Sequence, residues 1–126
     1  VGDISGNAEK ILRAVQQATL ADAELVITPE LALCGYPPKD LLLRDDFYQS
    51  CYQTLQMITQ EIDDITLVIG HPHHDGCKLY NSASVICSGK ITHTYHKRFL
   101  SKPPFFNEFY YFDGCKKLLF FSKVSF

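Results

Sequence analysis

Apolar residues recur near the start of the chain with the period of an α-helix. From Asn7 onward they fall on one face of a 3.6-residue repeat, at Ala8, Ile11, Leu12, Val15 and Ala18. Asn7 is suited to cap the first turn, and Glu9 lies where a negative charge favours the helix dipole. The pattern therefore predicts a helix that begins at Asn7.

A short run of apolar and β-branched residues follows at 24–28. Such a run is typical of a strand that is covered on both faces. Residues 34–44 then contain Gly35, Pro37 and Pro38, which interrupt regular structure. We expect a buried strand that leads into an irregular loop.

A second helix is predicted after this loop, opened by Asp45 and Asp46. Its buried stripe has helical spacing and consists of Phe47, Cys51, Leu55, Ile58 and Ile62. Residues 66–70 read as a second buried strand that ends at Gly70-His71-Pro72. Because strand, helix and strand follow in that order, the two strands are expected to lie parallel and adjacent.

Two more strands are predicted at 79–87 and 90–96, on either side of a tight turn at Ser88-Gly89. After Ser101 the sequence becomes aromatic and irregular. The 126 residues fit one α/β domain or part of one, without an internal repeat or linker.

Charge, hydropathy and cysteine content exclude several classes of partner and environment. The net charge is −2 and the cations are scattered, so we expect no nucleic-acid partner. No apolar run approaches the roughly 20 residues of a membrane span, so no membrane partner is expected. The cysteines are odd in number and lack Cys-x-x-Cys spacing, which favours a reducing cytoplasm over a disulfide framework: Cys34, Cys51, Cys77, Cys87 and Cys115.

Glu30 and Lys97 are the main catalytic candidates, because each follows a predicted strand. Attack on an amide needs a base to activate the nucleophile and a positive group near the developing oxyanion. We expect the two side chains to meet in one hollow, where each stabilises the charge of the other. A solvated loop glutamate and a surface salt bridge worth about 0–1 kcal/mol remain the alternatives.

The sequence gives weaker support for a metal site, a serine triad or a phosphate-binding loop. A metal could be held by four neighbouring side chains, but they flank a proline in a predicted strand-exit loop, so a polar loop is favoured: His71, His73, His74 and Asp75. A triad of Ser82, His96 and Asp113 lacks the Gly-x-Ser-x-Gly turn that usually presents such a serine. The glycines form no phosphate-binding motif.

Several segments resemble the carbon-nitrogen hydrolase (nitrilase) superfamily, and within it the glutaminase domains of glutamine-dependent NAD synthetases. They are Val-Gly-Asp-Ile-Ser-Gly-Asn at 1–7, Pro-Glu-Leu-Ala-Leu-Cys-Gly-Tyr-Pro-Pro-Lys-Asp-Leu-Leu-Leu-Arg at 29–44, Ile-Gly-His-Pro at 69–72, Leu-Tyr-Asn-Ser-Ala at 79–83 and Tyr-His-Lys-Arg-Phe-Leu at 95–100. The resemblance covers about residues 1–112. It implies an incomplete α-β-β-α sandwich, with residues 1–126 forming part of one glutaminase domain and the synthetase domain absent.

The resemblance also implies roles for particular residues. Glu30 matches the general base, Lys97 the catalytic lysine and Glu108 a second glutamate that supports them, while Tyr36 is a candidate for substrate binding. Pro103 stands where the family has a tyrosine that helps to hold glutamine. No cysteine has the flanking residues of the family's nucleophile, so the chain is expected to contain none and to be inactive alone.

By the same resemblance, the intact enzyme would hydrolyse glutamine through a cysteinyl thioester and pass ammonia to a C-terminal synthetase domain. That domain would use ATP and Mg²⁺ to convert deamido-NAD to NAD, whereas this part needs no cofactor or metal. A cytoplasmic homo-oligomer is expected. Another amidase of the superfamily, or a non-catalytic truncated product or interaction module, is the alternative.

Overall fold

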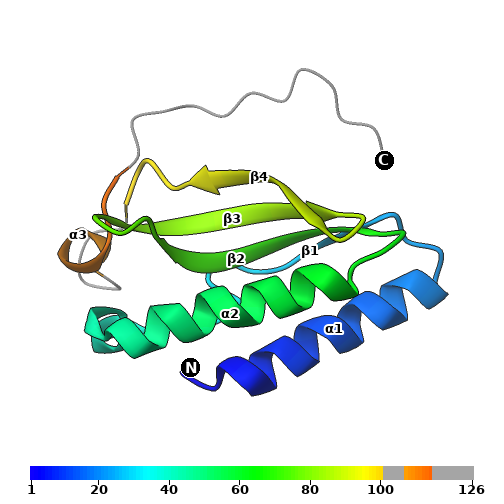
Figure 1. The fold of residues 1–126 in the computed structure, drawn as a ribbon, viewed down its shortest axis with the longest axis horizontal. Helices are drawn as coiled ribbons and strands as arrows, with labels where there is room; N and C mark the ends of the chain where they lie inside the picture. The colour runs from blue at the N-terminus through cyan, green and yellow to red at the C-terminus, as the bar shows by residue number, and fades with distance from the viewer. Residues whose placement is uncertain (101–106, 115–126) are drawn as a thin grey trace.

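The computed structural model describes residues 1–100 and 107–114, which include a four-stranded sheet with two long helices on one face (Figure 1). The strand order is β1 (Leu25–Ile27), β2 (Thr66–His74), β3 (Leu79–Cys87) and β4 (Lys90–His96). β1 pairs with β2 in parallel, and the other neighbours are antiparallel. The predicted parallel pair and the predicted hairpin are confirmed. Pro103 and Cys115 lie outside the described residues.

Helix α1 (Ile4–Leu20) begins three residues earlier than predicted. Its cap is Asp3, whose carboxylate accepts a hydrogen bond from the N–H of Gly6 at 3.0 Å. Asn7 therefore lies inside the helix, and its carboxamide donates to the carbonyl of Leu33 at 3.1 Å. The prediction of Asn7 as the cap is wrong, because Ile4 is already buried and extends the apolar face backwards.

Helix α2 (Asp45–Glu61) matches the prediction closely. Asp45 and Asp46 occupy its first turn, directly after the short 3₁₀ helix η1 (Lys39–Leu43). The predicted apolar stripe is buried along its whole length, with Ile62 just beyond the helix: Phe47, Cys51, Leu55, Ile58 and Ile62. The 3.6-residue period was enough to predict both the helix and its buried face.

Strand β2 is longer than predicted. It continues through Gly70-His71-Pro72 to His74, because β3 pairs with it from Leu67 as far as His74. The predicted strand-exit loop at His71 and Pro72 is therefore wrong. Antiparallel pairing with β3 satisfies the backbone hydrogen bonds of this polar half of the strand. Because β3 is a separate segment, the local sequence pattern could not predict this pairing.

Strand β1 is shorter than predicted and is not covered on both faces. Leu25 is 37% exposed and Ile27 is 68% exposed, whereas Val26 packs against the core. The two long helices lie on one face of the sheet only (Figure 1), and Ile27 lies on the opposite face.

The core lies between the helices and the sheet. Ile11 and Ile58 of the helices pack with Leu67, Ile69 and Ile86 of the strands. The described residues thus form one helical layer and one sheet layer of the predicted α/β sandwich. None of the helices described is both long and apolar enough to cross a membrane.

Candidate active site

The loop after β1 holds Glu30 against β2. Leu33 donates its N–H to the carbonyl of Gly70 at 3.1 Å, and the N–H of Gly70 donates to the hydroxyl of Thr28, also at 3.1 Å. A Cβ at Gly70 would lie 2.6 Å from the backbone atoms of Pro29 and Leu31, so only glycine permits this contact. Leu31 and Leu33 are fully buried and anchor the loop.

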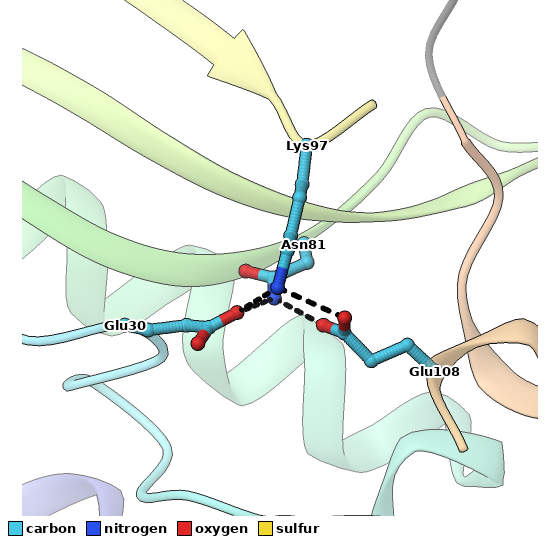
Figure 2. Close-up of polar contacts among 4 residues, drawn as sticks. All are labelled: Glu30, Asn81, Lys97 and Glu108. Carbon is cyan, nitrogen blue, oxygen red and sulfur yellow. Dashed lines mark hydrogen bonds and ion pairs between the residues drawn. The ribbon is translucent and has the colours of Figure 1, made fainter. Parts of the chain in front are cut away.

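Lys97 lies between two carboxylates (Figure 2). Its Nζ is 2.6 Å from Glu30 Oε1 and 2.9 Å from Glu108 Oε2. Lys97 follows β4 directly, whereas Glu108 begins the short helix α3 (Glu108–Tyr111). The expected meeting of Glu30 and Lys97 is confirmed, and Glu108 joins them.

Asn81 of β3 completes the cluster. Its Nδ2 donates to Glu30 Oε1 and to Glu108 Oε1, each at 2.7 Å (Figure 2). Asn81 was not among the predicted site residues, although its segment carries part of the resemblance. A signal was present: Asn81 shares one face of a predicted strand with Leu79 and Ala83, and a carboxamide buried there needs polar partners.

The three ionisable side chains differ in exposure. The side chain of Glu108 is fully buried, that of Lys97 is 29% exposed and that of Glu30 is 42% exposed. Burial lowers the pKa of Lys97, but hydrogen bonds to Glu30 and Glu108 and their charges outweigh it and raise the pKa overall. Lys97 is therefore cationic at neutral pH, and only Glu30 of its two partners reaches the surface.

A hollow of about 240 Å³ adjoins the cluster. Glu30, Asn81 and Lys97 line it, together with apolar residues that include Ile27 and Tyr95. It opens on the sheet face opposite the helices, because Ile27 is in register with Val68, and Tyr95 with Ala83, on that face. The lining combines a few polar and charged groups with apolar side chains, as small-molecule sites do.

Tyr36 does not line this hollow. It is 42% exposed and lies in the loop between Glu30 and η1. Its role in substrate binding stays a prediction.

The histidines that suggested a metal site lie in β2. His71 is 2% exposed, and its ring nitrogens contact Ser84 Oγ at 2.7 Å and the carbonyl of Pro72 at 3.1 Å. Burial lowers the pKa of His71 to about 4, so its ring is neutral. His73 stacks on His96 and His74 on Tyr48. In the described ranges, no three potential ligands converge on a point.

The serine triad is not assembled. Ser82 Oγ lies 2.6 Å from His96 Nδ1, but the carboxylate of Asp113 accepts the N–H of Leu79 at 3.0 Å instead. Ser82 is also only 3% exposed. The pair therefore fixes the end of β4, directly before Lys97.

The described cysteines do not supply a nucleophile to the cluster. Cys34 and Cys51 are buried, and burial raises the pKa of each thiol to about 12. The Cys34 thiol donates to the carbonyl of Leu31, and Cys87 contacts Thr66. No cysteine among the described residues lines the hollow.

Comparison with known proteins agrees with this geometry. Residues 1–123 match the family model for carbon-nitrogen hydrolases. The chain belongs to this family. The resemblance inferred from the sequence is therefore confirmed at the level of the family.

Similar curated proteins include glutamine-dependent NAD(+) synthetases. The one from Xylella fastidiosa strain Temecula1 is 42% identical over 114 residues, which are 90% of this chain and 21% of that protein. The one from Synechocystis is 41% identical over 129 residues, which are 96% of this chain and 23% of that protein. The chain spans about a fifth of the length of these relatives.

Solved structures share the fold. The glutamine-dependent NAD+ synthetase of Acinetobacter baumannii in complex with ADP gives a TM-score of 0.90 at 33% identity, over 98% of this chain and 24% of that one. A mutant amidase of the nitrilase superfamily from Nesterenkonia AN1 gives 0.77 at 24% identity, over 92% of this chain and 45% of that one. The expected nitrilase-type fold is confirmed.

Proposed function

We propose that this chain is part of the glutaminase domain of a glutamine-dependent NAD synthetase, and that Glu30, Lys97 and Glu108 perform amide hydrolysis there. The observation that carries the proposal is the position of Lys97 Nζ, 2.6 Å from one carboxylate and 2.9 Å from another, beside a hollow. The similarity to NAD synthetases over most of this chain supports glutamine as the amide.

Each residue has a task in this proposal. Glu30, the more exposed carboxylate, takes the proton of a cysteine thiol as sulfur attacks the amide carbon, and returns it to the ammonia that leaves. Lys97 stabilises the oxyanion of the tetrahedral intermediate. Buried Glu108 holds the ammonium in place. Water then hydrolyses the thioester, which releases glutamate and regenerates the thiol. The cysteine that carries this thiol is not one of the described residues.

The remaining steps belong to the whole protein. Ammonia passes to a synthetase domain that binds ATP and Mg²⁺ and converts deamido-NAD to NAD. The full-length enzyme is a cytoplasmic homo-oligomer. These proposals rest on relatives more than four times as long as this chain.

A segment exchange tests the function. Residues 1–100 replace the matching segment of the Xylella fastidiosa relative, and NAD formation is measured with glutamine and, separately, with ammonia as the nitrogen source. We expect both rates within about tenfold of the parent, because the exchanged segment brings Glu30, Asn81 and Lys97. Loss of the glutamine-dependent rate alone contradicts the proposal. Faster hydrolysis of simple aliphatic amides than of glutamine favours another amidase of the superfamily.

The 126-residue chain by itself is predicted to release no ammonia from glutamine. Catalytic groups of this kind act as a unit, and no described cysteine reaches the hollow. The measurement is ammonia release by the purified chain, with Glu30→Gln as its comparison. Steady release that Glu30→Gln abolishes would show that the chain contains its own nucleophile.

A further inference from the structure

Asn81 makes the same contact with both carboxylates of the cluster. Its Nδ2 carries two hydrogens, and the distances of 2.7 Å to Glu30 Oε1 and to Glu108 Oε1 use both of them. Ionised carboxylates only accept hydrogen bonds, so the nitrogen must face them and the carboxamide oxygen must point away, as Figure 2 shows. The orientation of Asn81 is therefore fixed by its partners.

The main chain holds Asn81 equally firmly. It lies within β3, opposite Pro72 of β2, and is 4% exposed. Its carbonyl accepts the N–H of Lys97 at 2.8 Å. One residue of a central strand thus contacts both carboxylates through its side chain and the lysine through its backbone.

These contacts make the two oxygens of Glu30 different. Oε1 accepts from Lys97 Nζ at 2.6 Å and from Asn81 Nδ2 at 2.7 Å. Oε2 accepts no hydrogen bond from any residue of 1–100 or 107–114, and in Figure 2 it points away from Lys97. An oxygen with two cationic or amide donors is a poor proton acceptor, whereas its neighbour keeps its lone pairs.

We propose that Asn81 is a positioning residue that, together with Lys97, occupies Oε1 of Glu30 and leaves Oε2 as the oxygen that accepts the proton. The carboxamide also binds Glu30 and Glu108 at once, on either side of the ammonium, although the like charges of the two carboxylates repel. The catalytic part of this inference rests on the proposed function. The positioning part concerns the chain alone.

The first test measures unfolding of the 126-residue chain as a function of pH. Asn81→Leu has a similar volume and no donor, and it is expected to raise the unfolding equilibrium constant at pH 7 by roughly tenfold to a hundredfold. A hydrogen bond to a carboxylate is stronger than one to a carboxylic acid, so the loss of stability in Asn81→Leu should shrink in acid.

The matched control is Asn7→Ala, which removes a carboxamide bond to the backbone carbonyl of Leu33 and touches no carboxylate. The loss of stability caused by Asn7→Ala should be the same at every pH. If Asn81→Leu does not fold, Asn81→Asp keeps the shape and should regain stability in acid, when the added carboxylate is protonated. A pH-independent deficit for both Asn81 variants overturns the inference.

The second test uses the exchanged enzyme. Asn81→Leu is expected to lower kcat for glutamine by roughly tenfold to a hundredfold with little change in KM, and to leave the ammonia-dependent rate unchanged. An unchanged kcat overturns the catalytic part. If the exchanged enzyme without further substitution fails with glutamine, the proposed function fails, while the unfolding profile still decides whether Asn81 positions the carboxylates.

Discussion

Lys97 has two carboxylate partners that differ in their access to solvent. Glu108 is fully buried and can act as a permanent counterion, whereas Glu30 reaches the hollow and can exchange a proton. The sequence could indicate Glu30 and Lys97, because each lies within a few residues of the end of a strand. The strand pattern could indicate a buried carboxamide at Asn81 but not its partners, since the segments that carry them meet only in the folded chain.

His71 gives the chain an acid-sensitive stability. Burial lowers its pKa to about 4 from 6.5, so the unfolded chain binds a proton in a range where the folded chain does not. This contribution of His71 to the unfolding free energy is fully present above pH 6.5. It amounts to roughly 3 kcal/mol and is lost as pH falls toward 4. His71→Asn is expected to flatten this part of the profile of unfolding free energy against pH.

The control for His71 is His93→Asn, a substitution on the exposed strand β4 that should leave the slope unchanged. An equal slope in the wild type and in His71→Asn would contradict the assignment. His73 and His96, whose pKa values burial also lowers, contribute to the slope that remains.

The loop after β1 depends on an element that is distant in sequence. Gly70 lies inside β2 and contacts Pro29 and Leu31, so β2 determines where Glu30 points. The apolar pattern predicted this strand but placed its end at Gly70, because histidines and a proline follow. The 3.6-residue period of α2 is contained in its own sequence, so this helix was predicted correctly. The extension of β2 depends instead on pairing with β3, which is distant in sequence.

Gly70→Ala is expected to destabilise the chain by about 3 kcal/mol, because its Cβ would lie 2.6 Å from backbone atoms that cannot move independently. Denaturant unfolding measures the loss. Gly76→Ala is the control, since nothing lies within 4 Å of its Cβ, and only its φ of +96° costs about 1 kcal/mol. Equal effects of the two substitutions would contradict the close packing of the loop on β2.

For the molecule as a whole, the helices and the candidate site lie on opposite faces of one sheet. The helical face buries the core, and the other face presents the hollow with exposed Ile27 and Tyr95 beside it. The sequence predicted the α/β class, the parallel pair and the hairpin. It did not predict which strand face would be uncovered, because β1 reads as apolar on both of its faces.

Glu30→Gln in the exchanged enzyme separates amide hydrolysis by the cluster around Lys97 from the later steps of NAD formation. The control is Glu9→Gln, on the exposed face of α1. The measurement is the ratio of the glutamine-dependent to the ammonia-dependent rate of NAD formation. Glu30→Gln is expected to lower this ratio by about a hundredfold or more, since a general base contributes roughly 10² to 10⁴. A ratio equal to that of the control would show that Glu30 is not the base.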